Sequence, residues 1–383
     1  MAHHRFLAKE AHESYRSDRM GEAALLFRRA ASAALEVGDR RAWFEHTVWA
    51  AQANSQLGDR PASLALVMAA RLDEPEDAPE HEAWMTRKLV FSNVRETCPE
   101  IARLQGYLED LHDFAATHNV AKGDLPEIEG HLMVSCGDWS KAVSANERSW
   151  SEHDGRGYLK IDKARVAALC ALRIGETTVC KDWLKAMADC DREWEVNAIY
   201  RAEVEVRLAL YEGKPACELI GLLRSLEDRS IAAQDAEVKD NLRELAVRVH
   251  CLDSGSGDPA TRRHPARQEL RHRVADWHSV SAKYDARLLF LDYRLACLRD
   301  AAGIPPVEDF YYTHPQFVPA HLTPSRVSVL SERLRRARVA AQRALRFGAG
   351  LDAMLGCDWR QREVRSRIER IEQIGDAIRS IAY

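Results

Sequence analysis

The chain has 383 residues, of which 46% are hydrophobic and 30% are charged, and its formal net charge is −4. Such a composition can bury a core, which excludes the disordered and collagen-like classes for the bulk of the chain. No apolar run approaches the ~18 residues that a membrane-spanning helix needs, so an integral membrane protein is excluded as well.

From the N-terminus onward, apolar residues recur at three- and four-residue spacing, which predicts an all-α chain. A helix-to-helix turn signature repeats in residues 17–23, 57–63, 136–142 and 174–180. Its anchors Asp18, Gly58, Gly137 and Gly175 are 40, 79 and 38 residues apart, and a fifth anchor at Gly213 follows 38 residues later. Because 79 is two periods, we expect one further pair of helices, without the signature, at about 78–121.

Small residues on both sides of each turn would let the two helices of a hairpin approach closely. Upstream of the turns these residues are Ala11, Ala51, Gly130 and Ala168. Downstream they are Ala23, Ser63, Ala142 and Cys180, followed seven residues later by Ala30, Ala70, Ser149 and Met187.

The small–small–aromatic–small series Ala11, Ala23, Phe27 and Ala30, together with the run 137–142, resembles the tetratricopeptide repeat (TPR) over about residues 5–225. The resemblance implies an all-α fold, a right-handed α-solenoid of about five TPR-like helical hairpins followed by a C-terminal helical region. We therefore expect a repeat array over residues 1–228.

The resemblance also implies that the first helix of each hairpin lines a concave face on which extended peptides bind. Chaperone-binding members carry Lys and Asn at two positions that are Ala8 and His12 here, which argues against a co-chaperone. The arginines on this face either hold an acidic segment through bidentate bonds or are solvated helix charges. The candidate partner-binding residues are His12, Tyr15, Arg16, Gln52, His131, Arg165, Arg173 and Arg207.

After the array, the pattern predicts a helical extension over 229–302 that contains a flexible loop at 252–261. Residues 303–324 are rich in proline and aromatic residues and form a candidate second contact or lid. The aromatic residues of this segment are Phe310, Tyr311, Tyr312 and Phe317.

Two capping helices are expected over 325–383, at about 325–347 and 358–381. The last helix carries an apolar stripe that would pack on the preceding helix or form a dimer seam. The stripe consists of Val364, Ile368, Ile371, Ile374 and Ile378.

Charge is unevenly distributed, with a net of −12 over residues 1–260 and +8 over residues 261–383. In the first capping helix, Arg335, Arg338 and Arg346 share roughly one face. This face is a candidate anion or nucleic-acid contact, or else it docks on the acidic array or faces water.

Standard catalytic motifs (GxGxxG, P-loop, GxSxG and HExxH) are absent from the sequence, and the nine cysteines include no CxxC pair. We therefore expect no enzyme, metal site or cofactor, and a reducing cytoplasmic location. The favoured function is a non-enzymatic scaffold or adaptor that binds a protein or peptide segment. The alternatives are a peptide- or ligand-sensing regulatory protein and a nucleic-acid-associated protein; the oligomeric state stays open.

Overall fold

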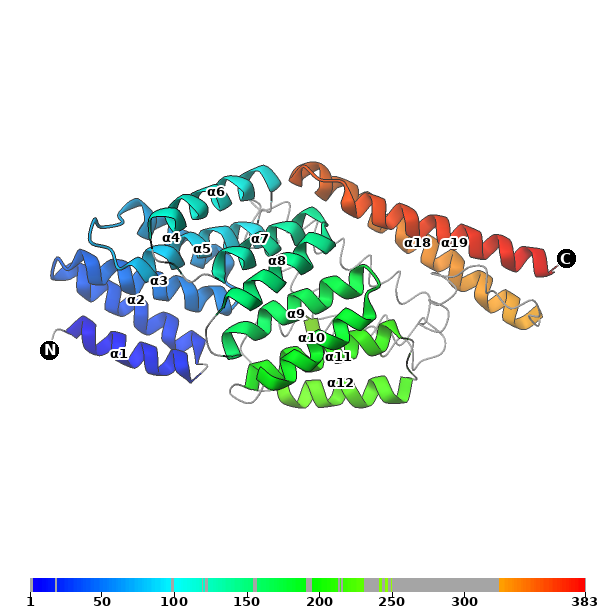
Figure 1. Ribbon diagram of the computed structural model, residues 1–383, viewed down its shortest axis with the longest axis horizontal. Coiled ribbons are helices and arrows are strands. Elements are labelled where there is room, and N and C mark those ends of the chain that lie inside the picture. The colour runs from blue at the N-terminus through cyan, green and yellow to red at the C-terminus, as the bar shows by residue number, and fades with distance from the viewer. Residues whose placement is uncertain are drawn as a thin grey trace. The chain divides into compact units, whose positions relative to one another are not determined.

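The computed structural model describes residues 3–230 except positions 18, 98–99, 119, 121–122, 154–156, 191–194, 213 and 215, scattered positions from 241 to 249, and residues 324–382. All regular structure in these residues is helical, which confirms the all-α prediction (Figure 1). None of the described helices combines the length and apolarity needed to cross a membrane. The predictions for the loop at 252–261 and for Phe310, Tyr311, Tyr312 and Phe317 lie outside the described residues, as does most of the extension 229–302.

Twelve helices of the described chain form six consecutive pairs, in which odd-numbered first helices alternate with even-numbered second helices. The pairs are α1 (His3–Arg16) with α2 (Met20–Glu36), α3 (Arg40–Gln56) with α4 (Arg60–Leu72), α5 (Glu80–Thr97) with α6 (Ile101–Thr117), α7 (Asp124–Cys136) with α8 (Trp139–Glu152), α9 (Gly157–Arg173) with α10 (Thr177–Cys190), and α11 (Glu195–Tyr211) with α12 (Ala216–Ser230). The pair α5–α6 is the predicted unit without a turn signature, so the described residues contain six successive helix pairs before α18.

One turn geometry recurs in the array and explains the repeated glycine. Gly58 and Gly137 have φ values of +78° and +74°, a left-handed conformation that glycine adopts without a Cβ penalty. The residue after each glycine donates its N–H to the carbonyl five positions back, as from Asp138 to Met133 at 2.9 Å. The Asp138 carboxylate then caps the next helix by accepting from the N–H of Lys141 at 3.3 Å. The same turn occurs at Gly38, between two hairpins.

Helices within a hairpin meet through the predicted small residues. Ala11, Ala23, Ala51 and Ala168 are completely buried, as expected. At Gly130 the helices come close, because a Cβ placed there would lie 2.6 Å from Nδ2 of Asn146 on α8. A larger residue at this contact would force the Asn146 side chain to shift, and the prediction of close helix approach is confirmed.

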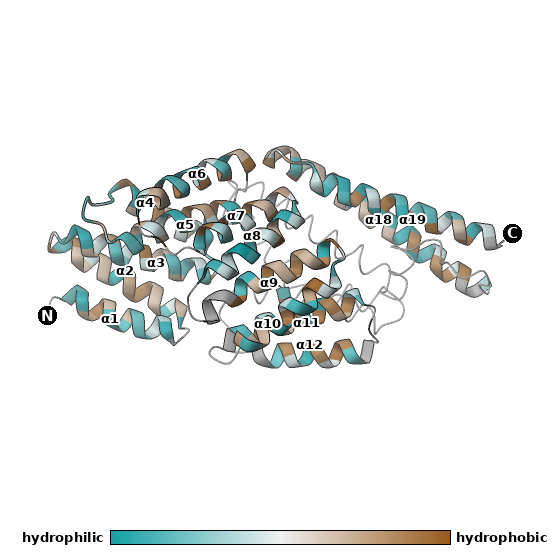
Figure 2. Ribbon diagram, viewed as in Figure 1, coloured by the Kyte–Doolittle hydropathy of each residue, from teal (hydrophilic) through white to brown (hydrophobic). Residues whose placement is uncertain are grey.

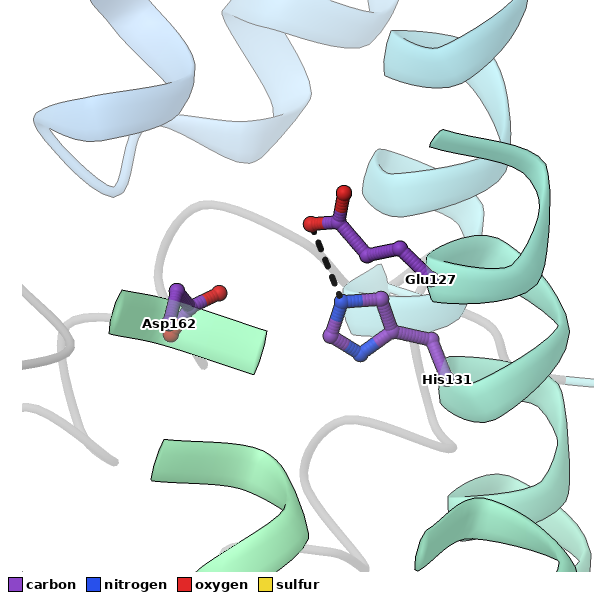
Figure 3. Close-up of side chains that lie close together, drawn as sticks. All are labelled: Glu127, His131 and Asp162. Atoms are coloured by element: carbon purple, nitrogen blue, oxygen red, sulfur yellow. Dashed lines mark ion pairs between the residues drawn. The ribbon is translucent and has the colours of Figure 1, made fainter. Parts of the chain in front are cut away.

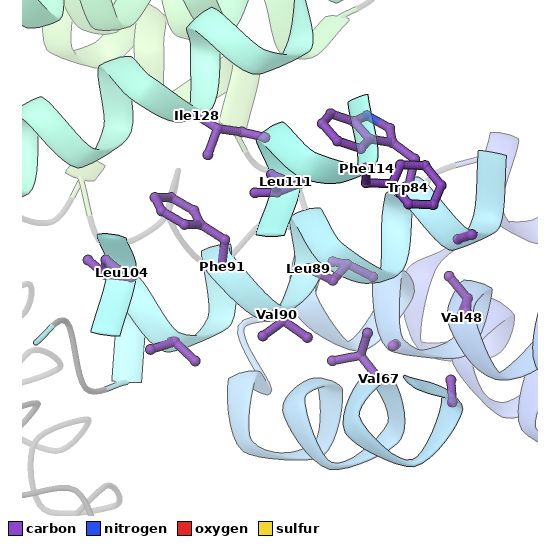
Figure 4. Packing of buried hydrophobic residues seen from close by; sticks show 14 of the residues in the cluster. Val48, Val67, Trp84, Leu89, Val90, Phe91, Leu104, Leu111, Phe114 and Ile128 are labelled. Atoms are coloured by element: carbon purple, nitrogen blue, oxygen red, sulfur yellow. The ribbon is translucent and has the colours of Figure 1, made fainter. Parts of the chain in front are cut away.

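Larger side chains fill the core between successive hairpins, and one continuous cluster runs from α3 to α7 (Figure 4). Phe91 and Leu104 are buried in it, and Trp84 stacks on Phe114 with ring centroids 6.0 Å apart. Since the helices from α1 to α7 share core clusters across successive hairpins, this part of the chain is stabilised by stacking rather than by isolated hairpins.

The chain divides into two compact units within α9, after Cys170. The first unit contains α1–α8 and most of α9. The second contains α10–α12 together with α18 (Pro324–Leu355) and α19 (Trp359–Ala382). The boundaries at 228, 302 and 324 that the sequence pattern suggests remain predictions.

The helices α18 and α19 form a hairpin with an aliphatic seam. Buried Leu334 and Ala341 of α18 face Ile371, Ile374 and Ile378 of α19, which confirms that the apolar stripe packs on the preceding helix. The helix α18 extends eight residues beyond its predicted end at 347, through two glycines that a helix interior tolerates at modest cost. It ends at a glycine with φ +70°, the turn geometry of the array.

Candidate functional site

In the first unit, polar side chains on successive first helices contact one another from α1 to α9. We call this row of contacts the polar ladder. Its members are Tyr15 with Gln52 and Gln56, Trp49 with Glu82, Lys88 and Trp84 with Asp124, Arg95 with His131, and Glu127 with Lys163. Several of them are residues that the TPR resemblance places on the concave face.

The contact between α1 and α3 is uncharged. Gln56 donates from Nε2 to the Tyr15 hydroxyl at 2.8 Å, and Gln52 does so at 3.4 Å. Beside them His12 packs edge-on against Trp49, with ring centroids 4.9 Å apart. Burial and the charge of Arg16 lower the pKa of His12, so it is neutral at pH 7. The structure thus brings the predicted residues His12, Tyr15 and Gln52 together.

Hydrogen bonds continue from α3 to α5. The indole Nε1 of Trp49 donates to Oε1 of Glu82 at 3.1 Å. Nearby, Asn93 of α5 donates to the hydroxyl of Ser63 on α4 at 2.8 Å, and Ser63 donates to the carbonyl of Ala51 on α3 at 2.7 Å. These bonds satisfy polar groups that would be costly to bury unpaired.

From α5 onward the ladder is charged. Asp124 of α7 accepts from Nε1 of Trp84 at 2.8 Å and pairs with Nζ of Lys88 at 3.0 Å. Burial alone would lower the pKa of Lys88, but the neighbouring Glu127 and Asp124 carboxylates outweigh it and raise the pKa. Lys88 is therefore a permanent cation.

The step from α7 to α9 is a partly buried ion pair, in which Glu127 Oε2 lies 2.9 Å from Nζ of Lys163. The Lys163 residue is only 4% exposed. Burial would raise the pKa of Glu127, but Lys163 and Lys88 hold it well below its usual range. Removing one member of this pair would leave a lone charge, which would be strongly destabilising.

Glu127, His131 and Asp162 bring three metal-ligating atoms within 4.8 Å of one another (Figure 3). The surroundings oppose a cation, because Lys163 already neutralises Glu127. Arg95 donates to Nδ1 of His131, which leaves the ring proton on Nε2, the nitrogen that faces Glu127. Metal-binding histidines instead donate their second N–H to a carboxylate or carbonyl. The cluster has the chemistry of an ion-pair network.

Three of the four predicted arginines have carboxylate neighbours in the described structure, namely Arg165, Arg173 and Arg207. Arg165 is buried beside Asp162, with 3.2 Å between the charged atoms. Arg207 lies 2.9 Å from Glu203. A ligand at these positions would compete with an existing ion pair. Arg173, exposed at the end of α9, lies 2.8 Å from Glu363 of α19. Arg16 is exposed on the last turn of α1.

Sequence reasoning missed the contribution of α5, the first helix of the unit without a turn signature. Its residues Lys88, Ser92, Arg95 and Glu96 stand 40 positions after the face residues of α3, and Lys88 and Arg95 are members of the polar ladder. The repeat period alone could have located them. The contacts at Glu82 and Lys163 lie off the face positions and carry no such signal.

No protein-family model matches the chain, and no curated protein matches it. Among solved structures, the chain is similar to one described as the crystal structure of the P58(IPK) TPR domain. The two are 9% identical and have a TM-score of 0.21, with 97% of this chain and 98% of that chain covered. A TM-score this low carries no argument. The all-α description of this chain rests on its own paired helices, glycine turns and small-residue contacts.

Proposed function

We propose that this chain is a non-enzymatic scaffold or adaptor that binds an extended segment of a protein partner along the polar ladder. The supporting observation is the contrast between the two helix types. First helices of five successive hairpins carry polar and aromatic side chains in one row, whereas the second helices α2, α4 and α8 pack mainly through alanine and other small residues.

The chemistry of the row suits an extended backbone, which presents N–H and C=O groups in alternation. Half-buried Gln52 and Gln56 carry both a donor and an acceptor, and Tyr15 and Trp49 supply aromatic surface. Aromatic and arginine side chains in such settings carry a large share of binding energy. The uncharged α1–α3 end favours neutral polar side chains in the partner, and the α5–α9 end favours charged ones.

Three of the described cysteines, Cys136, Cys180 and Cys357, give no support to a nucleophilic enzyme. Burial raises the pKa of Cys180 to about 11 and that of Cys357 to about 12, and it raises the pKa of Cys136 as well. At neutral pH these groups are thiols, whereas the reactive form is the thiolate.

The test is affinity purification of the tagged full chain from extracts of its source cells, treated with nuclease. The ladder variant carries Gln52→Arg and Ser92→Arg, which fill the row with long cations. The matched control carries Gln105→Arg and Ser32→Arg, the same two changes at exposed positions of second helices.

We expect the wild type and the control to retain a stoichiometric protein partner that the ladder variant loses at least about tenfold, the equivalent of 1.4 kcal/mol. A partner retained equally by both variants would contradict binding along the polar ladder. Recovery of a small molecule in place of a protein would favour the sensor alternative.

A further inference from the structure

The helix α18 carries a concentrated positive charge that binding along the polar ladder does not use. Residues 333–346 contain six arginines and no acidic residue. We propose that the exposed arginine face of α18 binds the phosphate backbone of a nucleic-acid duplex without reading its sequence. This inference concerns a different surface from the proposed function and does not depend on it.

The arginines of this face lie outside the buried helix seam. Arg335, Arg338, Arg343 and Arg346 are exposed, while Leu334 and Ala341, on the opposite side of α18, are buried against α19. Figure 2 shows the alternation of hydrophilic and hydrophobic residues along both helices. From 335 to 346 the row is about 16 Å long at the rise of an α-helix. A duplex carries one negative charge per about 1.7 Å of its axis, so several phosphates lie within reach.

Counter-charges within the hairpin are too few to neutralise the face. Arg335 and Arg336 share one carboxylate, that of Glu332, at 2.7 and 2.8 Å. Hydrogen bonds from these two arginines lower the pKa of Glu332 to about 2, so this carboxylate is ionised and already pairs with both of them. Arg338 pairs with Glu372 at 2.9 Å. Over residues 324–382 there are 13 arginines and seven acidic residues, which leaves a net charge of +6.

The other acidic side chain of α18 does not reach this face. Asp352 is completely buried and pairs with buried Arg360 at 3.1 Å inside the turn of the hairpin. Against the carboxylates of the described hairpin the segment 333–346 therefore keeps a charge excess, and a field of one sign attracts a polyanion over about one Debye length, ~10 Å at 0.1 M salt.

Two polyanions fit such a face, a nucleic acid and an acidic protein surface, and the observations favour the nucleic acid. Acidic groups of the chain's own array, such as Asp110, Asp124 and Glu127, already pair with Arg or Lys. Guanidinium forks match phosphate oxygens in a bidentate manner. Because residues 333–346 include no aromatic side chain for base stacking, a duplex backbone fits better than a single strand.

The test uses the full chain and a fluorescein-labelled random duplex of about 24 base pairs, with binding followed by anisotropy from about 50 to 300 mM NaCl. The face variant carries Arg335→Gln, Arg338→Gln and Arg346→Gln. The matched control carries Arg362→Gln, Arg370→Gln and Arg379→Gln, the same loss of charge at exposed positions of α19. Hydrogen exchange of α18 and α19 verifies that both variants keep the hairpin.

We expect wild-type binding with a slope of log K against log salt of about −3 to −4, as for four neutralised phosphates. The face variant should bind at least about tenfold more weakly with a slope near −1, and the control should stay within about threefold of the wild type. Absence of binding at the lowest salt, or equal losses in both variants, would overturn the proposal. Displacement by poly-glutamate at equal charge concentration would assign the face to an acidic protein instead.

Discussion

The array hairpin α7–α8 and the C-terminal hairpin α18–α19 use the same turn but pack through different chemistry. Both turns contain a left-handed glycine, Gly137 with φ +74° and Gly356 with φ +70°, and the same hydrogen bond from the next residue to a carbonyl five positions back. The array hairpin then closes on Gly130, Ala142 and other small residues, whereas the C-terminal hairpin closes on a seam of leucine, isoleucine and alanine.

This difference in packing determines which helix faces of each hairpin remain available for polar and charged side chains. Small residues bury little apolar surface, so an array hairpin depends on its neighbours, and its first helix turns a polar row toward the next first helix. An aliphatic seam recurring every three or four residues, as in a coiled coil, needs no third helix. The outer faces of α18 and α19 are therefore left for charge.

The largest effect is expected from Asp352→Asn, in the turn of the C-terminal hairpin. The change leaves Arg360, which is 4% exposed, without its counter-charge, and breaking such a buried pair costs about 3–5 kcal/mol. Hydrogen exchange of α18 and α19 in the full chain should accelerate accordingly. Asp376→Asn, at an exposed ion pair, is the control and should have little effect. Equal acceleration of hydrogen exchange by the two changes would contradict a stabilising role for the ion pair between Asp352 and Arg360.

The next largest effect concerns close packing in the array. In Gly130→Ala the new Cβ meets Nδ2 of Asn146, which donates to the carbonyl of Ala142 at 2.8 Å, and overpacking of this kind costs about 1–3 kcal/mol. Gly106→Ala, in open space on α6, should instead stabilise by about 0.5–1 kcal/mol. The melting temperature should therefore fall in Gly130→Ala and rise in Gly106→Ala. If adding Asn146→Ala does not relieve Gly130→Ala, the clash is not the cause.

Because the two hairpins share a turn geometry, replacing the turn glycine should reduce the stability of each by a similar amount. Gly137→Ala and Gly356→Ala each place a Cβ in the left-handed region, at a cost of about 1–2 kcal/mol. Hydrogen exchange should accelerate near residue 137 in one variant and near residue 356 in the other. A large effect in only one hairpin would show that the common geometry has different energetic roles.

The smallest expected effect is that of acid on the two hairpin types. The free energy of unfolding should change by less than about 1 kcal/mol between pH 7 and pH 6. Burial, His4 and His12 lower the pKa of His46 to about 4, although Asp39 acts in the opposite direction. The unfolded chain therefore takes up a proton that the folded chain refuses, and stability present above about pH 6.5 declines as the pH falls toward 4.

Residues 324–382 contain no histidine, so acid loosening should affect exchange in α1 and α3 more than in α18 and α19. The variant His46→Gln should flatten the dependence of the melting temperature on pH between 7 and 5. An unchanged pH dependence in this variant would remove His46 from the explanation.

The fold could be predicted from sequence because its determinants are local. Gly58 and Gly137 mark turns by themselves, and Ala11 or Ala168 marks a helix contact by size alone. The ladder was predicted only in part, since ion pairs such as Glu127 with Lys163 depend on the register of two helices 36 residues apart in sequence. The predicted end of α18 was wrong because seam contacts stabilise the helix beyond two glycines. It ends at a turn that Asp352 stabilises by hydrogen bonding.

The central claim, that a protein segment binds along the polar ladder, is tested most directly by site-specific photo-crosslinking in source cells. A benzoylphenylalanine at position 52 or 92 reports on the ladder, and one at position 105 or 32 reports on exposed second helices. The account predicts crosslinks to one protein partner from positions 52 and 92, with little product from 105 and 32. Crosslinks from 105 or 32 without product from 52 and 92 would contradict it.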